Sequence, residues 1–195
     1  MYKRQVSWWE ATAYCRWLNR DGSSGAPAGS IVRLTTESEW ERAARGPHIA
    51  GEETPIWAWG RDWRDGIANT AECDLGRTTP VGIFPSAERK GGPWDLSGNV
   101  WEWCLNWFDP EAYRKRAKEC VGATAEGIAK YQVYSVDDGA FIDGHGRVVR
   151  GGGWAGGARD ARVSFRYGNA PALRLAGLGF RCAASPVALG LGPRP

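Results

Sequence analysis

Apolar residues at a helical spacing begin close to the start of the chain. The residues Ser-Trp-Trp-Glu that start at Ser7 can form a capping box, with Ser7 as the N-cap and Glu10 at the third helical position. Apolar side chains then recur on one face as far as Leu18, and turn-forming residues follow from 19 to 29. This pattern predicts an amphipathic helix that starts after Ser7 and ends near Leu18.

The same capping device recurs at Thr36 and Glu39. A second short amphipathic pattern runs from there through Arg45, and Gly46 follows as a natural helix stop. Beyond Gly46 we find only a weak helical period, over residues 110–118. Two early helices followed by turns and short extended pieces predict an α+β fold that is rich in coil.

Strand and turn signals occupy most of the remaining chain. Residues 47–89 have the composition of turns and short extended pieces, and residues 131–136 and 147–149 have the composition of strands. The segment 108–130 is more polar, and the last residues are punctuated by Pro and Gly. The predicted organisation is one domain over residues 1–183, with a surface insertion at 108–130 and a disordered tail at 184–195.

The stretch from Arg147 to Ala183 has neither a helical nor an alternating period. It combines recurring Arg, Gly, Trp and Phe residues with small or assorted residues between them. We expect the recurring residues to form a fixed frame through side-chain hydrogen bonds and stacked guanidinium groups, with the loop positions between them free to bind or react. The frame consists of Arg150, Gly151, Gly152, Trp154, Arg159, Arg162, Arg166, Asn169, Pro171, Arg174, Gly179, Phe180 and Arg181.

Composition excludes several classes of function. The formal net charge of the 195-residue chain is +3, which is too small for the basic footprint of a nucleic-acid-binding protein, and no run of apolar residues is long enough to span a membrane. An odd number of cysteines without a C-x-x-C pair argues against a zinc site and against a complete disulfide framework. We therefore expect buried or half-buried free thiols at Cys15, Cys73, Cys104, Cys120 and Cys182.

Common catalytic patterns are also missing from the sequence. His48 and His145 lie far apart in turn-like contexts, and we interpret both as surface residues. The glycines 151–153 lack the Lys-Ser/Thr pair and the following helix of a phosphate-binding loop, and no nucleophile elbow is present. The 12 Trp and 27 Gly residues instead indicate a loop-rich fold that large aromatic side chains hold together.

Six motifs follow one another along the chain: VSWWEATAYCRWLN (6–19), RLTTESEWERAARG (33–46), WAWG (57–60), TTPVGIFPS (78–86), WDLSGNVWEWC (94–104) and RVVRGGGW…GFRCA (147–183). In this order they resemble the formylglycine-generating-enzyme, or sulfatase-modifying factor, family, which has a variant of the C-type lectin fold. The motifs cover almost the whole chain, so the resemblance implies this fold. Domains of the family begin with further strands before the first helix, and we expect those N-terminal strands to be missing here.

The founding activity of this family oxidises a sulfatase cysteine to formylglycine with a pair of cysteines and copper. The resemblance places those cysteines just after the Arg-Gly-Gly-aromatic motif, in the stretch from Ala155 to Ser164, which contains no Cys. Neither Gly nor Ala can replace a thiolate as a copper ligand or redox centre. We therefore expect no copper and no enzyme of this kind. Sulfoxide synthases related to the family are also disfavoured, because they take their iron from a separate domain with clustered His.

The stretch from Arg150 to Arg181 resembles another branch more closely, the variable proteins of diversity-generating retroelements. In those systems a reverse transcriptase copies a template with errors at adenines, so that Asn codons become nearly random. The frame residues match the fixed positions of such a template. The resemblance implies that the variable, ligand-binding positions are Ala155, Gly156, Gly157, Asp160, Phe165, Tyr167, Gly168, Ala170, Leu173, Leu175, Ala176 and Gly177.

The residues between Ala155 and Arg181 agree with this origin. Changes in the first two bases of AAC or AAT give codons for Ala, Gly, Asp, Phe, Tyr and Leu, but none for Lys, Glu, Gln, Met or Trp. None of those five residues occurs in this stretch, although Glu and Trp are common elsewhere in the chain. A loop rich in Gly and Ala would often meet the same condition, so the agreement supports diversification without establishing it.

Four of the variable positions carry side chains large enough to anchor a partner. We expect Tyr167 and Leu173 to be exposed, whereas packing into the core is an equally good interpretation of Phe165 and Leu175. The sequence thus favours a non-catalytic protein that displays a diversified surface to a protein or cell-surface ligand, with no nucleic-acid partner. The alternative is a formylglycine-generating-enzyme-like oxidase or an accessory protein of the same family.

The motif from Trp94 to Glu102 also matches a calcium site of the family. Calcium takes several oxygen ligands, and the resemblance implies a structural ion held by two carboxylates and two backbone carbonyls. The alternative is that the aspartate caps a turn and the glutamate accepts hydrogen bonds from backbone N–H groups or an arginine. The implied ligands are Asp95, Gly98, Val100 and Glu102, and those of a second, weaker site are Asn69, Thr70 and Asp74.

Overall fold

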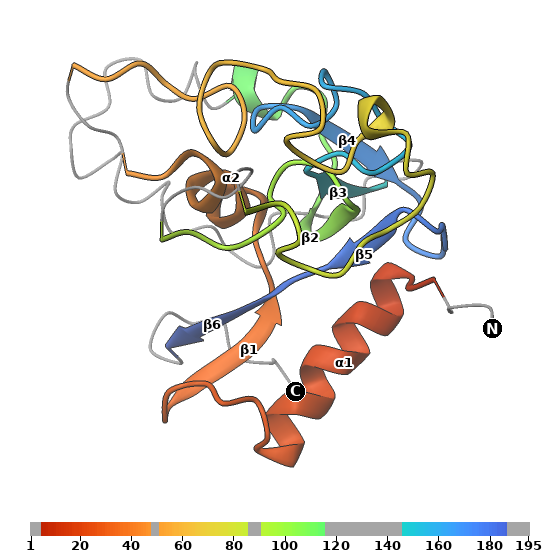
Figure 1. The fold of residues 1–195 in the computed structure, drawn as a ribbon. Coiled ribbons are helices and arrows are strands. Elements are labelled where there is room, and N and C mark those ends of the chain that lie inside the picture. The colour runs from red at the N-terminus through yellow and green to blue at the C-terminus, as the bar shows by residue number, and fades with distance from the viewer. Residues whose placement is uncertain (1–4, 48–50, 86–90, 116–145, 187–195) are drawn as a thin grey trace.

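The computed structural model describes residues 5–47, 51–85, 91–115 and 146–186. Two helices pack against short strands that long loops connect (Figure 1). This arrangement confirms the predicted α+β, coil-rich fold. The elements are α1 (Trp8–Asp21), β1 (Ser30–Leu34), α2 (Glu37–Arg45), the 3-10 helix η1 (Ala71–Cys73), β2 (Trp101–Trp107), β3 (Arg147–Arg150), β4 (Arg166–Asn169), β5 (Leu178–Phe180) and β6 (Cys182–Pro186).

The first predicted helix forms with its capping box. The Ser7 hydroxyl accepts the Glu10 N–H at 3.2 Å, and the Glu10 carboxylate accepts the Ser7 N–H at 2.9 Å. The helix continues to Asp21, about one turn beyond the predicted end. There Gly22 adopts a φ of 70° and donates its N–H to the Leu18 carbonyl, because a left-handed residue closes the last turn.

The second predicted helix is confirmed with both of its ends. The Thr36 hydroxyl accepts the Glu39 N–H at 3.2 Å, and the Glu39 carboxylate accepts the Thr36 N–H at 2.9 Å. The helix ends at Arg45, directly before Gly46. Arg33 of β1 donates to both carboxylate oxygens of Glu39 at 2.7 Å, so the start of α2 is also tied to the preceding strand.

A four-stranded sheet with the order β4-β3-β2-β5 contains most of the regular structure of the last third of the chain. β3 pairs antiparallel with β2 and β4, whereas β5 runs parallel to β2. The predicted strand at residues 147–149 is therefore confirmed. The expectation of coil throughout the rest of this stretch was wrong at β4 and β5, which have four and three residues and are too short to leave a period in the sequence.

β6 corrects the predicted disordered tail at its first residues. The strand pairs antiparallel with β1 along its whole length, so residues 184–186 belong to a sheet. Small side chains without apolar alternation give no strand signal, and main-chain pairing with β1 determines the structure instead. The remaining tail at 187–195, the predicted strand at 131–136 and most of the insertion at 108–130 lie outside the described residues.

Buried clusters lie on both faces of the four-stranded sheet. Neighbouring residues on a strand point to opposite faces, and Val148 and Val149 of β3 belong to two different clusters. Val149 shares its cluster with Trp8 of α1, whereas Val148 shares its cluster with Trp40 of α2. The two helices therefore anchor opposite sides of the sheet from which the segment 150–181 emerges.

Candidate ligand-binding surface

Arg150 fixes the start of the segment that contains the predicted variable positions. Its guanidinium is fully buried and donates to the Glu41 carboxylate of α2 at 2.6 Å. It also donates to the backbone carbonyls of Val163 and Phe165 at 2.7 and 2.8 Å. A buried guanidinium needs a countercharge and hydrogen bonds. Here α2 supplies the countercharge, and the loop after β3 supplies the carbonyl acceptors. Arg150 thus ties β3, α2 and the following loop together.

Three further frame arginines form bidentate ion pairs, in which two parallel N–H···O bonds fix the relative orientation of guanidinium and carboxylate. Their N···O distances lie between 2.5 and 2.9 Å. The pairs join Arg166 to Glu37, Arg174 to Glu10 and Arg181 to Glu102. The predicted side-chain frame therefore connects the segment to α1, α2 and β2.

A predicted stacked guanidinium is found at Arg147, just before this segment. Its Cζ atom lies 3.8 Å from the ring centroid of Trp8 and 3.7 Å from that of Trp107. The side chain also donates to the Leu105 carbonyl at 2.6 Å. Burial lowers the pKa of Arg147 to about 10, and the aromatic faces and the carbonyl stabilise the cation that remains at neutral pH.

Two frame glycines occupy positions that side chains cannot fill. Gly151 and Gly152 have φ values of 95° and 71°, in the region that favours glycine. A Cβ atom at Gly152 would lie 2.9 Å from the backbone nitrogen of Ala161, and one at Gly151 would lie 3.1 Å from the Trp40 ring. The Arg-Gly-Gly motif is therefore a requirement of the backbone path and of close packing.

The glycines at the predicted variable positions differ from these two. None of Gly156, Gly157, Gly168 and Gly177 has a positive φ. A Cβ atom at Gly177 would make an ordinary 3.4 Å contact, and one at Gly157 would lie 3.0 Å from the flexible end of a glutamate. At Gly168, however, a Cβ atom would lie 2.6 Å from the Phe108 ring, so a side chain there requires that ring to move.

None of the twelve predicted variable positions is buried. Tyr167 and Leu175 are 54% and 47% exposed, so Leu175 is not a core residue. Phe165 and Leu173 are half-buried, which makes Leu173 less exposed than predicted. The exposed positions are Ala155, Tyr167, Ala170, Leu175 and Ala176, and the half-buried ones are Gly156, Gly157, Asp160, Phe165, Gly168, Leu173 and Gly177.

Two of these positions contribute to an aromatic group formed by residues of β2, of β4 and of the position just before β4. The ring centroids of Trp101 and Phe165 are 5.8 Å apart, and those of Trp101 and Tyr167 are 6.3 Å apart. The guanidinium carbons of Arg159 and Arg162 each lie 6.0 Å from the Phe165 ring centroid. Trp101 was not among the predicted binding residues, and its large ring within a matched motif is the one signal that could have marked it.

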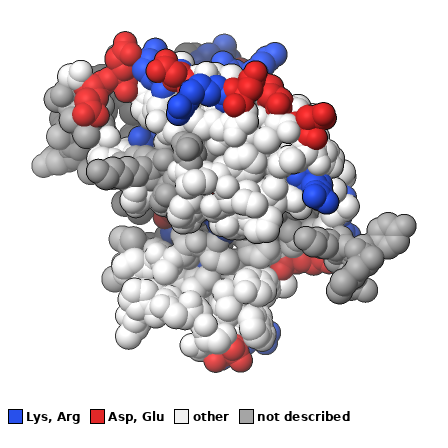
Figure 2. Space-filling view, in the orientation of Figure 1, with Lys and Arg blue, Asp and Glu red and all other residues white. Residues whose placement is uncertain are grey.

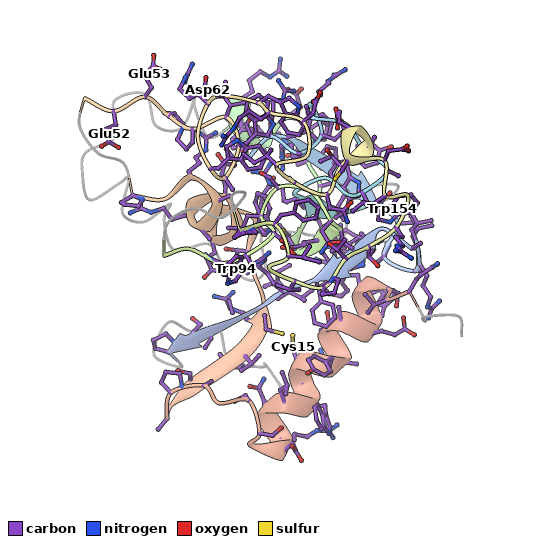
Figure 3. The ribbon with its side chains drawn as sticks, viewed as in Figure 1. Cys15, Glu52, Glu53, Asp62, Trp94 and Trp154 are labelled. Atoms are coloured by element: carbon purple, nitrogen blue, oxygen red, sulfur yellow. The ribbon has the colours of Figure 1, made fainter. Side chains whose placement is uncertain are left out.

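A cavity of about 570 Å³ lies beside the variable positions Leu175 and Ala176. Val100 and Trp154 supply apolar wall, and Arg77 supplies a cationic side chain from the loop after η1. The cavity is large enough for one or two side chains of a partner. Variable and fixed residues thus line it together, on the side of the molecule where Figure 3 labels Trp154.

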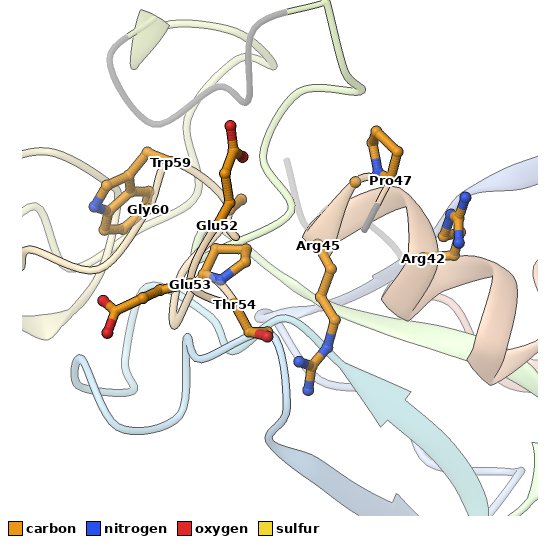
Figure 4. A pocket seen from close by; sticks show the side chains of 11 residues that line it. Arg42, Arg45, Pro47, Glu52, Glu53, Thr54, Trp59 and Gly60 are labelled. Atoms are coloured by element: carbon orange, nitrogen blue, oxygen red, sulfur yellow. The ribbon is translucent and has the colours of Figure 1, made fainter. Parts of the chain in front are cut away.

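A second cavity, of about 440 Å³, has no predicted variable position in its lining. It lies between the end of α2 and the loop that carries Glu52 and Trp59 (Figure 4). Arg45 at its edge is paired with Glu41 at 2.7 Å, and Glu53 is paired with Arg61 at 2.8 Å. The lining therefore carries charges of both signs, and two of these charged residues are already paired with other residues of the chain.

On the face shown in Figure 2, charged residues gather along the upper rim, with smaller groups at the right side and at the lower end. Acidic and basic residues alternate along that rim, and the middle of the face is largely uncharged. The described residues on this face therefore form no continuous basic patch of the kind that binds a phosphate backbone.

The predicted calcium ligand Glu102 has other partners. Both of its carboxylate oxygens accept from Arg181 at 2.5 Å, and one also accepts from the Trp40 indole at 2.7 Å. Asp95 instead accepts from the Asn99 amide at 3.0 Å. These three hydrogen bonds use most of the roughly four acceptor positions of the Glu102 carboxylate. The contacts of Glu102 match the hydrogen-bonded alternative, and calcium binding by this motif stays a prediction. The Gly98 and Val100 carbonyls alone make no site.

The second predicted metal site has one feature that fits a cation. The side-chain oxygen of Asn69 is buried and has no hydrogen-bond partner among the described residues, although its amide nitrogen donates to the Arg77 carbonyl at 3.0 Å. Thr70 is buried next to it, whereas Asp74 is exposed. An unpaired buried oxygen is unfavourable unless a donor, water or cation meets it. Asn69 is thus the best-placed oxygen ligand of the predicted set.

The described cysteines are free thiols and lie outside the stretch 155–164. Cys15, Cys73 and Cys104 are buried or half-buried as predicted, whereas the prediction was wrong for Cys182, which is exposed at the start of β6. Burial raises the pKa of the Cys104 thiol, which keeps it protonated at neutral pH. In the described part of the chain, no group of three His, Cys, Asp or Glu side chains is placed to hold a metal ion. The helices described there are also too short or too polar to cross a membrane. Of the predicted thiols and histidines, Cys120, His48 and His145 lie outside the described residues.

Comparison with known sequences gives one family. The model of the sulfatase-modifying factor enzyme 1-like domain matches residues 3–186. A formylglycine-generating enzyme from Streptomyces coelicolor is 35% identical over 197 residues, which cover 91% of this chain and 51% of that protein. The inactive C-alpha-formylglycine-generating enzyme 2 of Mus musculus is 31% identical over 192 residues, covering 92% and 48% respectively. The chain spans about half the length of these relatives.

Solved structures show the same fold. Treponema denticola variable protein 1 superimposes with a TM-score of 0.64 at 22% identity, over 94% of this chain and 70% of that chain. PvdO from Pseudomonas aeruginosa superimposes with a TM-score of 0.58 at 25% identity, over 93% and 60% respectively. Similarity at this level relates the folds, and function has to be argued from the surface itself.

Proposed function

Because the chain belongs to the sulfatase-modifying factor enzyme 1-like family, we propose that it is a non-catalytic member that binds its ligand through a diversified surface. The fold is the C-type lectin-like fold of the formylglycine-generating-enzyme type, as the motif order predicts. Membership of this family is by itself as compatible with an oxidase as with a non-catalytic protein. The choice therefore depends on the chemistry of residues 150–181.

The observation that carries the proposal is the separation of this segment into fixed and replaceable positions. Arg150 is buried, and Arg166, Arg174 and Arg181 are paired with glutamates of other elements. The twelve interspersed positions are exposed or half-buried, and their glycines have no positive φ. A frame that is stable without the interspersed side chains is what a protein with a variable surface requires. Gly168 is the one position whose surroundings argue against free replacement.

The absence of thiols after the Arg-Gly-Gly motif supports a non-catalytic role. Positions 155–164 contain no Cys, and Ala161 within them is fully buried. The described thiols are held by other elements, with Cys15 on α1 and Cys104 on β2. A copper centre that uses two thiolates has no ligands in this segment. A relative named as inactive is consistent with loss of the activity within the family.

The chemistry of the surface suits a protein or cell-surface ligand. Trp101, Phe165 and Tyr167 form an aromatic group next to guanidinium groups, and aromatic and Arg side chains dominate binding energy at interfaces. The cavity beside Leu175 offers a place for an apolar side chain of the partner. If calcium binds, its role is structural, and the Asn69 side chain fits it better than Glu102 does.

Replacing Tyr167 and Leu173 by Ala tests the proposal with a ligand obtained by selection. Peptides are first selected from a displayed random library on the wild-type protein. We expect the double variant to bind them at least about 10-fold more weakly, the effect of losing roughly 1.4 kcal/mol at an interface. We expect its melting temperature to stay within about 4 °C of wild type, because neither side chain is buried. Affinity is measured by calorimetry and stability by circular dichroism.

The control is Ile83→Ala, which removes a similarly exposed side chain outside the variable positions and should leave peptide affinity unchanged. Unfolding of the double variant more than about 10 °C below wild type would identify Tyr167 and Leu173 as core residues. Equal peptide affinity in the double variant would place the binding surface elsewhere. Copper-dependent oxidation of a cysteine in a sulfatase peptide would support the oxidase alternative.

A further inference from the structure

Two frame arginines, Arg159 and Arg162, differ from the other arginines of the segment 150–181. The other four each hold a glutamate of α1, α2 or β2 in an ion pair. Within the described part of the chain, neither Arg159 nor Arg162 has a carboxylate partner. Arg162 donates from Nε to the Arg159 carbonyl at 2.9 Å, and this bond leaves its terminal nitrogens unused. The frame therefore does not need the charges of these two side chains.

Both guanidinium groups lie beside the aromatic part of the proposed binding surface. Each Cζ atom is 6.0 Å from the ring centroid of Phe165, so the two cations are at most twice that distance apart. Phe165 in turn contacts the Trp101 ring, which contacts Tyr167. Arg159 is exposed and Arg162 is half-buried. Accessible cations and aromatic rings therefore share one small area of the surface.

The backbone that carries the two arginines is held in place from several sides. The Trp57 indole donates to the Ala158 carbonyl at 2.8 Å, and the Ala158 N–H donates to the Glu72 carboxylate at 2.7 Å. On the other side, the Phe165 N–H donates to the Arg162 carbonyl at 2.9 Å. A ligand would therefore have to order only the ends of the two side chains, which keeps the entropic cost of binding low.

We propose that Arg159 and Arg162 bind carboxylates of an acidic peptide segment, and that an aromatic or apolar side chain of the same segment packs on Trp101, Phe165 and Tyr167. A guanidinium matches a carboxylate in shape and can donate two parallel hydrogen bonds to it. The inference rests on the proposed function and names the chemical class of its ligand. Because both arginines belong to the fixed frame, diversification of their neighbours would leave this preference for acidic partners unchanged.

The arrangement fits a peptide better than a long polyanion. A nucleic acid or a sulfated polysaccharide is held by a row of cations along its backbone. Here the two guanidinium groups are separated in the sequence by the carboxylate of Asp160, which forms no ion pair with a described residue. An isolated pair of cations next to aromatic rings instead resembles the Arg and aromatic anchors of protein interfaces.

Peptides selected from a displayed random library on the wild-type protein test the proposal. We expect them to be enriched in Asp and Glu, and versions with Asn and Gln in place of every Asp and Glu to bind at least about 10-fold more weakly. The double variant Arg159→Gln, Arg162→Gln should lose the same factor for the acidic peptides. For the neutral peptides it should lose no more than roughly 2-fold, because the interacting charges are already gone. Calorimetry measures the affinities.

The matched control is Arg16→Gln with Arg20→Gln, which removes the same number of charges from exposed positions of α1. It should leave peptide affinity unchanged, so that a loss in the first variant reports the local cations and not the net charge. The Arg159→Gln, Arg162→Gln variant should also melt within about 4 °C of wild type, because neither side chain holds a carboxylate of the frame. Unfolding well below that range would assign the two arginines to the frame and overturn the proposal.

The outcomes separate this inference from the proposed function. Peptides without acidic enrichment, whose binding needs Tyr167 and Leu173 but not the two arginines, would overturn the inference and leave the proposed function standing. Binding that depends on neither pair of residues would overturn both. Retention of the protein on immobilised heparin that only the Arg159→Gln, Arg162→Gln variant loses, with no preference for acidic peptides, would assign the cations to a polyanion and overturn the peptide.

Discussion

Glycine has two distinct roles in the segment 150–181, and the structure separates them residue by residue. Gly151 and Gly152 have positive φ values and lie against the Trp40 ring and the Ala161 backbone, so they shape the chain. Gly177 has ordinary backbone angles and room for a side chain. In a sequence the two kinds are identical letters. Only the backbone conformation tells which glycine belongs to the frame and which to the replaceable positions.

A pair of matched substitutions measures this difference. Gly177→Ala should change the free energy of unfolding by no more than about 0.5 kcal/mol, because its Cβ atom makes an ordinary contact. Gly152→Ala should destabilise the protein by about 2 kcal/mol or more, because it combines a left-handed φ with a 2.9 Å approach to backbone. Urea titration followed by tryptophan fluorescence gives both values. Equal losses in the two variants would contradict the division into fixed and replaceable positions.

The sequence predicted single residues unevenly. The exposure of Tyr167 followed from the alignment with a variable template, and the structure agrees. Glu102 was assigned to calcium by resemblance, yet it holds Arg181. These two residues are 79 positions apart, and their pairing depends on β5 lying beside β2. No local pattern in the sequence carries that information. An arginine partner for Glu102 could therefore be given only as one of the alternatives to calcium.

At the level of elements, the start of α1 was predicted correctly, because the capping box is a local signal. The Glu10 carboxylate of this capping box also connects α1 to the segment 150–181. Glu10 accepts from Ser7 within the cap and from both Nε and a terminal nitrogen of Arg174 at 2.9 Å. No strand was predicted at β1, β2, β4, β5 or β6. The short strands β4, β5 and β6 are defined by their partner strands more than by their own side chains.

The ion pair between Glu10 and Arg174 predicts that the stability of the protein depends on pH. The Arg174 hydrogen bond, with those from Ser7, lowers the pKa of Glu10 from 4.5 to about 2. A carboxyl whose pKa is lower in the folded state stabilises the protein above its unfolded pKa, and the contribution is lost as the pH falls toward the folded pKa. We therefore expect the melting temperature to decline as the pH falls from about 4.5 to 2, and Glu10→Gln to remove part of that decline.

Glu52→Gln is a suitable control for this titration, because Glu52 is exposed and lies outside the pair that Glu10 forms with Arg174. Melting curves by circular dichroism between pH 2 and 7 would compare the three proteins. The Gln at position 10 can still complete a capping box, so a difference between Glu10→Gln and wild type reports the charge. Identical pH profiles for those two proteins would show that the Glu10–Arg174 pair adds no stability.

At the level of the whole molecule, the order of six motifs predicted the family and the fold, which the comparisons confirm. Three of the motifs supply the glutamates that pair with frame arginines, namely Glu10, Glu37 and Glu102. What lies between the frame residues could not be predicted in the same way. The aromatic group around Trp101 and the cavity beside Leu175 arise from residues that the fold brings together.

The DNA around the coding segment for residues 150–181 provides the most direct test of the central claim, that these positions are diversified. We expect a near-repeat of this segment beside a reverse-transcriptase gene, with Asn codons at the twelve variable positions and differences almost only at adenines. Frame codons such as those of Arg150, Gly152 and Arg181 should be unchanged between the two copies. An intact locus without such a repeat would contradict diversification and would leave an ordinary loop rich in Gly and Ala on a family fold.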